Sequence, residues 1–205
     1  NKESLSNINL EINSGETIGV VGKIGSGKST FANALLRLYN LEKETLFIDD
    51  IDIMDCNIAS VRDNIGYVPQ DNFLFSDKVK NNIAFFNKNI EEEKVIEAAK
   101  FAAVHDNIVD FKEGYDTISG ERGVTLSGGQ KQRISIARAF IKDAPIMILD
   151  DSVSAVDVKT EETILNNKNF STKNFLLNSE FRIPNFKIAK QSNYALCIMH
   201  YALCI

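Results

Sequence analysis

A glycine-rich segment near the start of the chain constrains the fold more than any other feature. Residues 22–29 have the sequence GKIGSGKS and lie between an apolar stretch, 17–21, and a helix-favouring stretch, 28–39. Glycines followed by Lys and Ser in this spacing are typical of a loop whose backbone N–H groups point at phosphate oxygens. The helix after such a loop directs its positive end at the same anion. The sequence therefore predicts a strand, loop and helix that bind the phosphates of a nucleotide.

This phosphate loop predicts a role for its polar residues. We expect Lys28 to reach the β- and γ-phosphates and the Ser29 hydroxyl to ligate Mg²⁺. The alternative is a glycine-rich turn without a ligand, and the apolar strand before the loop and the helix after it argue against that alternative. The expected ATP-binding residues are Gly22, Gly25, Ser26, Gly27, Lys28, Ser29 and Thr30.

Apolar runs alternate with helical segments along most of the chain. Residues 64–68 and 146–149 are apolar runs of strand length, and such strands between helices indicate a parallel sheet covered on both faces. Residues 5–12 alternate as a half-buried strand does, residues 45–53 favour a further strand, and residues 91–103 form the clearest helical stretch. The predicted fold class is therefore α/β with a helical insertion.

Composition excludes several classes of protein. The net charge of −5, with Lys and Arg spread along the chain, argues against a nucleic-acid-binding surface. The three cysteines, Cys56, Cys197 and Cys204, show neither metal-ligand spacing nor a disulfide framework, so a reducing compartment is expected. No apolar run is long enough to span a bilayer, so a membrane function would need residues outside these.

A second glycine-containing motif, at residues 126–130, has the sequence LSGGQ. Its serine is placed to cap a helix that runs to about Ile141, and its glycines permit close approach to the backbone. Followed by Lys-Gln-Arg, the motif resembles the signature of the ABC superfamily of ATP-binding cassettes. The resemblance implies that it completes the ATP site of a facing cassette. The implied signature residues are Leu126, Ser127, Gly128, Gly129 and Gln130.

Two further motifs resemble catalytic parts of this family. Residues 67–70, YVPQ, resemble the Q-loop, whose glutamine approaches Mg²⁺ and the attacking water. Residues 146–150 resemble the Walker B strand, whose aspartate holds Mg²⁺ through water. The resemblance therefore implies Ser29, Gln70 and Asp150 as the Mg²⁺ residues, and Gln70 and Asp151 as catalytic residues.

Other segments resemble parts of exporter cassettes that face a neighbour. Residues 154–157 resemble the D-loop, which places Asp157 at a dimer interface. Residues 120–123 resemble an element that touches the transmembrane domains, although a charged surface turn is the simpler interpretation of that segment alone. Residues 71–86 are similar to the stretch that follows the Q-loop glutamine in exporters. The resemblance runs from about residue 4 to residue 167.

The resemblance implies a P-loop NTPase core of the ABC ATPase type. We expect a mostly parallel sheet, an N-terminal antiparallel β region and an inserted helical subdomain. The expected segments are the first part of the ATP-binding core (1–70), the helical subdomain with the signature (71–142), the second part of the core (143–170) and an atypical tail (171–205). The pentapeptide YALCI occurs twice in that tail, at 194–198 and 201–205, which favours an aberrant, non-native terminus over a real extension, and we expect no packed element after about Phe170.

The chain departs from the family pattern in three places. Asp151 stands where strongly hydrolysing members have glutamate, and its side chain is shorter by about 1.5 Å. A misplacement of about 1 Å can cost about a hundredfold in rate, so we expect good ATP binding and slow hydrolysis at this chain's own site. Neither the family's switch histidine nor its adenine-stacking aromatic residue is found; His200 lacks the pattern, and we expect His105 to be an ordinary histidine.

The function that follows is the ATP-binding and ATP-hydrolysing motor of an exporter. Its expected partners are ATP with Mg²⁺, a second cassette in a homodimer or, as Asp151 favours, a heterodimer, and a transmembrane domain at the cytoplasmic face of the cell membrane. One alternative is a cassette that binds ATP and lends its signature without turnover. Another is a soluble ABC ATPase of DNA maintenance or translation, but the spacing from Lys28 to Asp150 leaves no room for the long coiled coil of the DNA-maintenance type.

Overall fold

The computed structural model describes most of the chain and divides it into two compact units. Unit 1 comprises Asn1–Ile65 with Lys173–Ile205, and unit 2 comprises Gly66–Thr172. Both strands and helices are present, so the predicted α/β class is confirmed. The described residues are 6–12, 18–20, 22–23, 25–85, 87, 89–120, 125–150, 160, 164 and 181–187.

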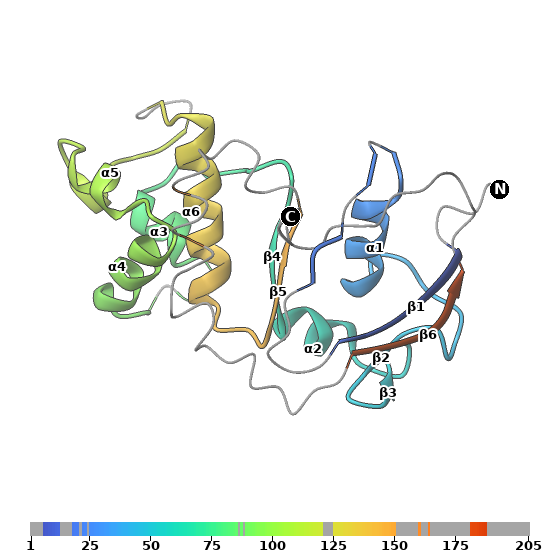
Figure 1. Ribbon diagram of the computed structural model, residues 1–205. Helices are drawn as coiled ribbons and strands as arrows, with labels where there is room; N and C mark the ends of the chain where they lie inside the picture. Colours follow the sequence, from blue (N-terminus) through green and yellow to red (C-terminus); the bar gives the residue numbers. More distant parts are fainter. Residues whose placement is uncertain are drawn as a thin grey trace. The chain divides into compact units, whose positions relative to one another are not determined.

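Unit 1 contains a four-stranded antiparallel sheet (Figure 1). The strands are β1 (Ser6–Ile12), β2 (Phe47–Ile48), β3 (Ile51–Asp52) and β6 (Phe181–Lys187), in the order β1-β6-β2-β3. The N-terminal antiparallel region is therefore present, but a strand from the far end of the chain lies between β1 and β2. The expectation that nothing packs after about Phe170 is wrong for residues 181–187.

The sequence signal for β6 is weak because Pro184 interrupts it. Ile8 pairs with Phe186 and Leu10 pairs with Ile183, so β6 spans three residues where β1 spans two. This irregularity is a bulge at the proline, and a bulge is one of the few places where a strand tolerates a residue without an N–H donor. Pro184, which in the sequence predicts the end of a strand, thus lies within strand β6.

The predicted strand at residues 45–53 is two short strands joined by a hairpin turn. Asp49 and Asp50 have φ values of 51° and 62°, so both lie in the left-handed region. Two consecutive residues of this conformation make the type I′ turn, whose twist matches that of the flanking strands. The acidic pair therefore reverses the chain in the middle of the predicted strand.

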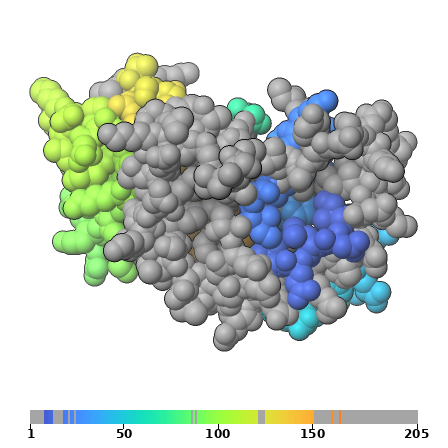
Figure 2. Space-filling view, viewed as in Figure 1, coloured from blue at the N-terminus to red at the C-terminus, as the bar shows by residue number. Residues whose placement is uncertain are grey.

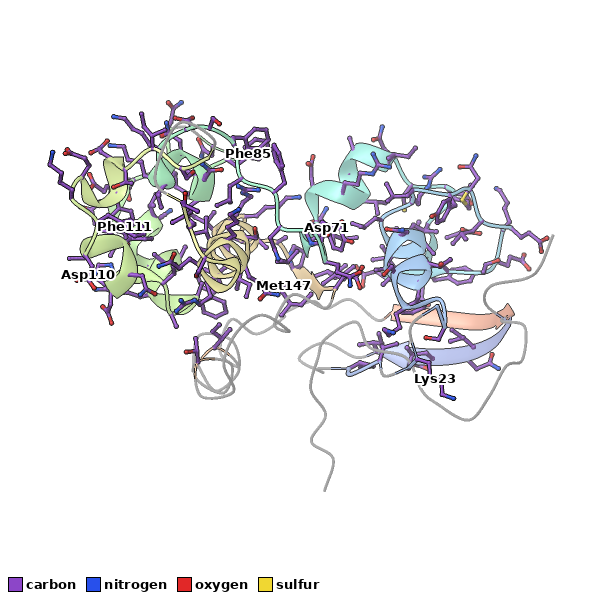
Figure 3. The ribbon with its side chains drawn as sticks, turned by 90° about the horizontal axis from the view of Figure 1, so that it is seen from above. Lys23, Asp71, Phe85, Asp110, Phe111 and Met147 are labelled. Atoms are coloured by element: carbon purple, nitrogen blue, oxygen red, sulfur yellow. The ribbon has the colours of Figure 1, made fainter. Side chains whose placement is uncertain are left out.

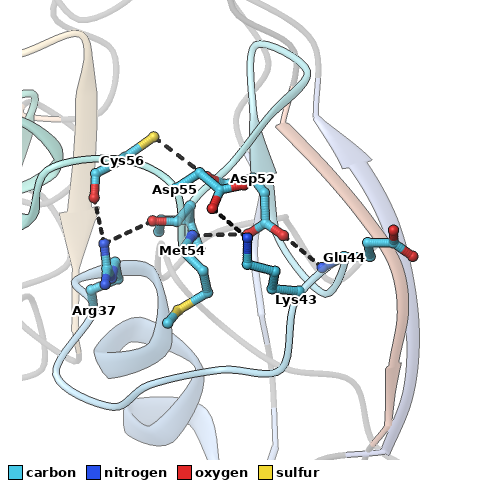
Figure 4. A network of polar contacts seen from close by, with 8 residues as sticks. Arg37, Lys43, Glu44, Asp52, Met54, Asp55 and Cys56 are labelled. Atoms are coloured by element: carbon cyan, nitrogen blue, oxygen red, sulfur yellow. Dashed lines mark hydrogen bonds and ion pairs between the residues drawn. The ribbon is translucent and has the colours of Figure 1, made fainter.

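Polar contacts join this hairpin to the helix that follows the phosphate loop (Figure 4). The Asp52 carboxylate accepts a 2.6 Å hydrogen bond from the Glu44 N–H, and this bond lowers the pKa of Asp52. Arg37 Nη1 donates to the carbonyls of Ile53 and Cys56 at 2.9 and 2.6 Å. Since Arg37 lies two residues beyond α1 (Lys28–Leu35), these bonds anchor the end of α1 away from the phosphate loop.

The two described helices of unit 1, of which only α1 was predicted, have a local basis in the sequence. Helix α1 begins at Lys28, as predicted, and buries the face formed by Phe31, Ala32, Ala34 and Leu35. Helix α2 (Ile58–Asp63) begins at Asn57, whose side chain accepts from the N–H groups of Ala59 and Ser60. In the space-filling view, parts of β1 and of the segment before and at the start of α1, drawn blue, reach the surface (Figure 2).

Unit 2 contains a pair of parallel strands, β4 (Ile65–Val68) and β5 (Ile146–Leu149). Gly66 lies beside Ile146, and the Asp150 N–H donates to the Val68 carbonyl at 2.9 Å, so the two strands run in the same direction. Both strands lie where the sequence predicts them. Among the described residues the parallel sheet is therefore smaller than the antiparallel one.

The other described elements of unit 2 are helices. Its helices are α3 (Val79–Ile83), α4 (Glu92–Phe101), α5 (His105–Val109), the 3₁₀ turn η1 (Gly114–Asp116) and α6 (Gly128–Ile141). Helix α6 packs against α3 and α4, and the rings of Phe101 and Phe140 stack with centroids 3.7 Å apart. Among the described helices, none has both the length and the apolar character needed to cross a membrane.

Candidate functional site: the phosphate loop, the strand ends and the signature helix

The phosphate loop has the backbone geometry that its sequence predicts. Gly25 and Gly27 have φ values of 80° and 94°, which side-chain-bearing residues rarely adopt. The Ser26 N–H donates to the Lys23 carbonyl at 3.0 Å and closes the turn. Gly27 is the N-cap of α1, where no side chain caps the helix and no acidic residue stands in the first turn. The positive end of α1 is therefore open to an external anion.

Two polar side chains of this loop have environments that bear on phosphate binding. The Lys28 ammonium donates to the Gly22 carbonyl at 2.7 Å and to the Lys23 carbonyl at 3.1 Å, so it lies across the loop. The Ser26 hydroxyl is buried and has no hydrogen-bond partner among the described residues. A buried hydroxyl without a partner costs stability unless a ligand satisfies it. A phosphate oxygen is an acceptor that would satisfy this hydroxyl.

The other predicted residues of the loop lie in or beside the first turn of α1. Ser29 is exposed and Thr30 is half-buried, and both follow Lys28 in the helix. The Lys23 side chain extends away from the loop toward solvent (Figure 3). Ile24, inside the loop, lies outside the described residues. All seven predicted ATP-binding residues belong to unit 1.

Asp150 ends strand β5 in unit 2 and is only 5% exposed. The Tyr67 hydroxyl donates to Asp150 Oδ2 at 3.3 Å, a long hydrogen bond. Burial, with Asp150 as the next cause, raises the pKa of Tyr67 to about 12, so the phenol keeps its proton at neutral pH. Tyr67 belongs to the YVPQ motif, but the sequence analysis gave it no role of its own.

Gln70 is brought to the same edge of the parallel strands as Asp150. The bond from the Asp150 N–H to the Val68 carbonyl holds the two strand ends side by side, and Gln70 lies two residues beyond Val68. Gln70 is exposed, and its backbone carbonyl accepts a hydrogen bond from the Asn72 side-chain amide at 3.4 Å. Figure 3 shows Asp71, the next residue, and Met147 of β5 in this part of unit 2.

The signature segment forms the predicted helix start. The Ser127 hydroxyl accepts from the Gln130 N–H at 3.2 Å, and Gln130 Oε1 accepts from the Ser127 N–H at 2.9 Å. This reciprocal capping box satisfies two backbone donors at the start of α6. Leu126 is buried and anchors the segment, whereas Ser127 and Gly128 are exposed and Gly129 and Gln130 are half-buried.

Gly128 is not required by the packing of this chain. A Cβ atom placed on Gly128 would meet nothing within 4 Å, and its φ does not lie in the left-handed region. By contrast, a Cβ on Gly66 would lie 2.9 Å from the Ala139 carbonyl oxygen, so that glycine serves packing within unit 2. The bare backbone at Gly128 is therefore available to a ligand or partner outside the chain.

Two predicted site residues, Asp151 and Asp157, lie outside the described residues. So do residues 121–124, which include most of the segment that resembles the exporter element at 120–123. Gly120 is described: its φ is 107°, and a Cβ there would lie 2.6 Å from the Ser76 hydroxyl. The positive φ and the close contact with Ser76 each require a glycine at position 120.

An exposed aromatic patch on unit 2, formed by Phe73, Phe75 and Phe85, was not predicted from the sequence motifs. These side chains are 65%, 41% and 46% exposed, and Phe85 is labelled in Figure 3. The Phe73 and Phe75 rings meet edge to face at 5.0 Å, and the Phe75 and Phe85 rings stack at 4.9 Å. The pattern Phe-x-Phe in a polar segment was the available signal. Three exposed, mutually packed rings are typical of an interaction surface.

Comparisons with known proteins agree on the family that these features indicate. The family model described as "ABC transporter" matches residues 5–154. A "Putative multidrug export ATP-binding/permease protein" of Staphylococcus aureus is 50% identical over 160 residues, which are 78% of this chain and 28% of that protein. The protein YgaD of Bacillus subtilis, with the same description, is 48% identical over 160 residues with the same coverage.

A solved structure is similar in fold as well as in sequence. The chain matches "a bacterial Atm1-family ABC exporter with ATP bound" with a TM-score of 0.70 and 43% identity, over 74% of this chain and 27% of that one. The chain therefore spans a little over a quarter of the length of the relatives that it matches.

Proposed function

The chain belongs to the ABC transporter family and is the ATP-binding cassette of an ABC exporter, and from that premise we propose that it is a motor that hydrolyses ATP. The observation that carries the proposal is the phosphate loop. Its two left-handed glycines, the uncapped positive end of α1 and the Lys28 ammonium all serve one anion. The buried Ser26 hydroxyl supports the same conclusion, since a phosphate oxygen would satisfy it.

In this proposal the residues of the chain divide the work of binding the triphosphate. Backbone N–H groups of the loop hold the phosphate oxygens, and Lys28 lies beside the β- and γ-phosphates. When bound, Mg²⁺ neutralises negative charge on the transferring phosphoryl group. The residues that the family resemblance implies for it are Ser29, Gln70 and Asp150, whose hydroxyl, amide and carboxylate oxygens are the donors that Mg²⁺ prefers. Tyr67, protonated up to about pH 12, orients the Asp150 carboxylate.

The signature is proposed to act on a nucleotide held by another cassette. The capping box leaves the start of α6 ordered and exposed, and Gly128 offers bare backbone that the chain's own packing does not use. ATP would then lie between the phosphate loop of one cassette and the signature of the other, in a homodimer or a heterodimer. Asp157 is proposed to lie at that dimer interface.

Slow hydrolysis at this chain's own site is a finer proposal that rests on Asp151. A general base must lie within about 2.6–3.2 Å of the water that it orients, and aspartate has less reach than glutamate. Gln70 is proposed to approach the same water. A cassette that only binds ATP and lends its signature to a partner is a second candidate function, and Asp151 is the observation that favours it.

The aromatic patch supports a permease partner. The relatives are described as ATP-binding/permease proteins, and this chain corresponds to 28% of their length. We propose that a permease segment docks on Phe73, Phe75 and Phe85, which would otherwise expose three apolar rings to water. The cassette would then work at the cytoplasmic face of a membrane. A soluble ABC ATPase of DNA maintenance gains no support from relatives of this kind.

The phosphate loop is tested by replacing Lys28 and, as a matched control, Lys23. We expect Lys28→Ala to weaken MgATP binding at least tenfold in calorimetry, because a charge-assisted contact to phosphate is worth about 1.5–3 kcal/mol. Lys23→Ala removes an exposed lysine of the same loop and should change the affinity by less than twofold. Equal affinities of the two variants would refute the assignment of Lys28.

A further inference from the structure

We propose that Arg138 is a positioning residue that ties the aromatic patch to the signature helix, so that occupation of the patch is communicated to the signature. The inference rests on the proposed function, in which a permease segment docks on the patch and the signature serves a partner's ATP. It assigns a role to two residues, Arg138 and Asn82, to which the sequence motifs gave none.

Arg138 contacts every part of the aromatic patch. Its guanidinium carbon lies 5.8 Å from the ring centroid of Phe75 and 5.5 Å from that of Phe85, within the range of a cation–π interaction. Its Nη1 donates to the backbone carbonyl of Phe73 at 3.0 Å. One side chain of α6 thus holds two rings by their faces and the third residue by its backbone.

The same guanidinium is fixed from the other side by Asn82 of α3. Arg138 Nε donates to the Asn82 carbonyl at 2.7 Å, and Nη2 donates to Asn82 Oδ1 at 2.9 Å. A planar fork held at three nitrogens has little freedom to reorient, whereas a lysine ammonium would be a single flexible point charge. These directional hydrogen bonds therefore fix both the place and the orientation of the Arg138 guanidinium relative to the patch.

Asn82 extends the connection into the loop that carries the patch. It is 1% exposed, and its Oδ1 also accepts from the Phe75 N–H at 2.9 Å. Its amide nitrogen donates to the Phe75 carbonyl at 3.0 Å and to Ser119 Oγ at 3.1 Å. Buried polar networks with satisfied partners act as units, because breaking one bond leaves an unpaired group. The loop after Gln70 thus moves with α3 and Arg138.

Helix α6 carries this connection to the signature. Arg138 lies near its C-terminal end, and the Ser127–Gln130 capping box forms its N-terminal end. Between them Arg133 Nη1 donates to the Ala103 carbonyl at 2.6 Å, which ties the helix to the turn after α4. Arg138 ties α6 to the patch, and α6 is one continuous helix from Gly128 to Ile141, so the patch and the signature end of the helix are joined by one rigid element. A shift at the aromatic patch therefore displaces the signature.

A double-mutant cycle in the full ATP-binding/permease protein, in lipid nanodiscs, tests this coupling. The two changes are Phe73→Ser, which removes the most exposed ring of the patch, and Arg138→Lys, which keeps the charge but cannot form the three-nitrogen fork. The readout is kcat for MgATP hydrolysis. Arg62→Lys is the matched background, because Arg62 also donates to two backbone carbonyls, those of Leu36 and Arg37, but lies in unit 1.

We expect Phe73→Ser to lower kcat at least threefold in the wild-type and Arg62→Lys backgrounds. In the Arg138→Lys background, Phe73→Ser should lower kcat by less than roughly 1.5-fold. If Arg138 has only a structural role, Arg138→Lys leaves the factor by which Phe73→Ser lowers kcat unchanged. The same threefold fall in the Arg138→Lys background overturns the inference and leaves the docking proposal standing. If Phe73→Ser does not lower kcat in the wild-type background, the docking proposal fails and the inference fails with it.

Discussion

Replacing Gly128 by alanine should stabilise the cassette and impair its function. The substitution adds a methyl group where nothing lies within 4 Å, in the first residue of α6 and at a φ that alanine adopts without strain. Gly-to-Ala changes at compatible positions stabilise by about 0.4–1 kcal/mol, chiefly by reducing the freedom of the unfolded chain. For a chain of this length that is a rise of about 1–4 °C in Tm.

The expected loss of function follows from the open space beside Gly128, which is where we propose that a partner's ATP binds. If the backbone at Gly128 approaches the phosphates of a partner's ATP, the new methyl group must hold that nucleotide further away. A displacement of about 1 Å can cost on the order of a hundredfold in rate, so we expect kcat of the full protein to fall at least tenfold. Thermal unfolding of the chain and steady-state hydrolysis by the full protein measure the two effects separately.

Two other glycines serve as controls for the sign of the stability change. Gly66→Ala should lower stability by about 1–3 kcal/mol, because its Cβ would lie 2.9 Å from the Ala139 carbonyl oxygen. Gly25→Ala should also lower it, by about 1–2 kcal/mol, because Gly25 has a φ of 80°. A fall in Tm for Gly128→Ala would show that Gly128 has a structural role. Unchanged hydrolysis would refute the contact with a partner's nucleotide.

Three further predictions concern other residues. Ser127→Arg should leave MgATP binding by the isolated chain unchanged, measured by calorimetry, but abolish hydrolysis when a cassette with a glutamate at its Walker B end is added; weaker binding by the isolated chain would place the signature in the chain's own site. Asp151→Glu should raise hydrolysis at this chain's own site tenfold or more, with the partner's site disabled by mutation, and an unchanged rate would favour the non-hydrolysing candidate. Hydrogen bonds from Lys78 and Lys80 lower the pKa of Asp116 to about 2, so the stability that they contribute is present above the ordinary value of 3.8 and is lost as the pH falls through about 2. The Tm of Asp116→Asn should therefore fall less than that of the wild type over this acid range, and equal slopes would contradict the ion pairing.

The sequence alone determined the features whose causes lie within a few residues. The turn made by the glycines of the phosphate loop, the apolar runs of β4 and β5, and the Ser127 cap of α6 depend on neighbours in the chain, and each is found where it was predicted. The family motifs follow the same rule, because each is a short segment with its own local geometry. The fold class and the family could therefore be inferred from the amino-acid sequence by itself.

Only the tertiary structure decided the features that join distant segments. The place of β6 between β1 and β2 depends on backbone pairing across most of the chain, and a bulge makes room for a proline that predicts no strand. The segment with Phe73 and Phe75 is bonded to Asn82 and to Arg138, and these two residues are 56 positions apart. A buried donor or acceptor must find a partner somewhere in the fold, but hydrophobic periodicity carries no information about which one. The partner of each buried polar group is determined only when distant segments of the chain pack together.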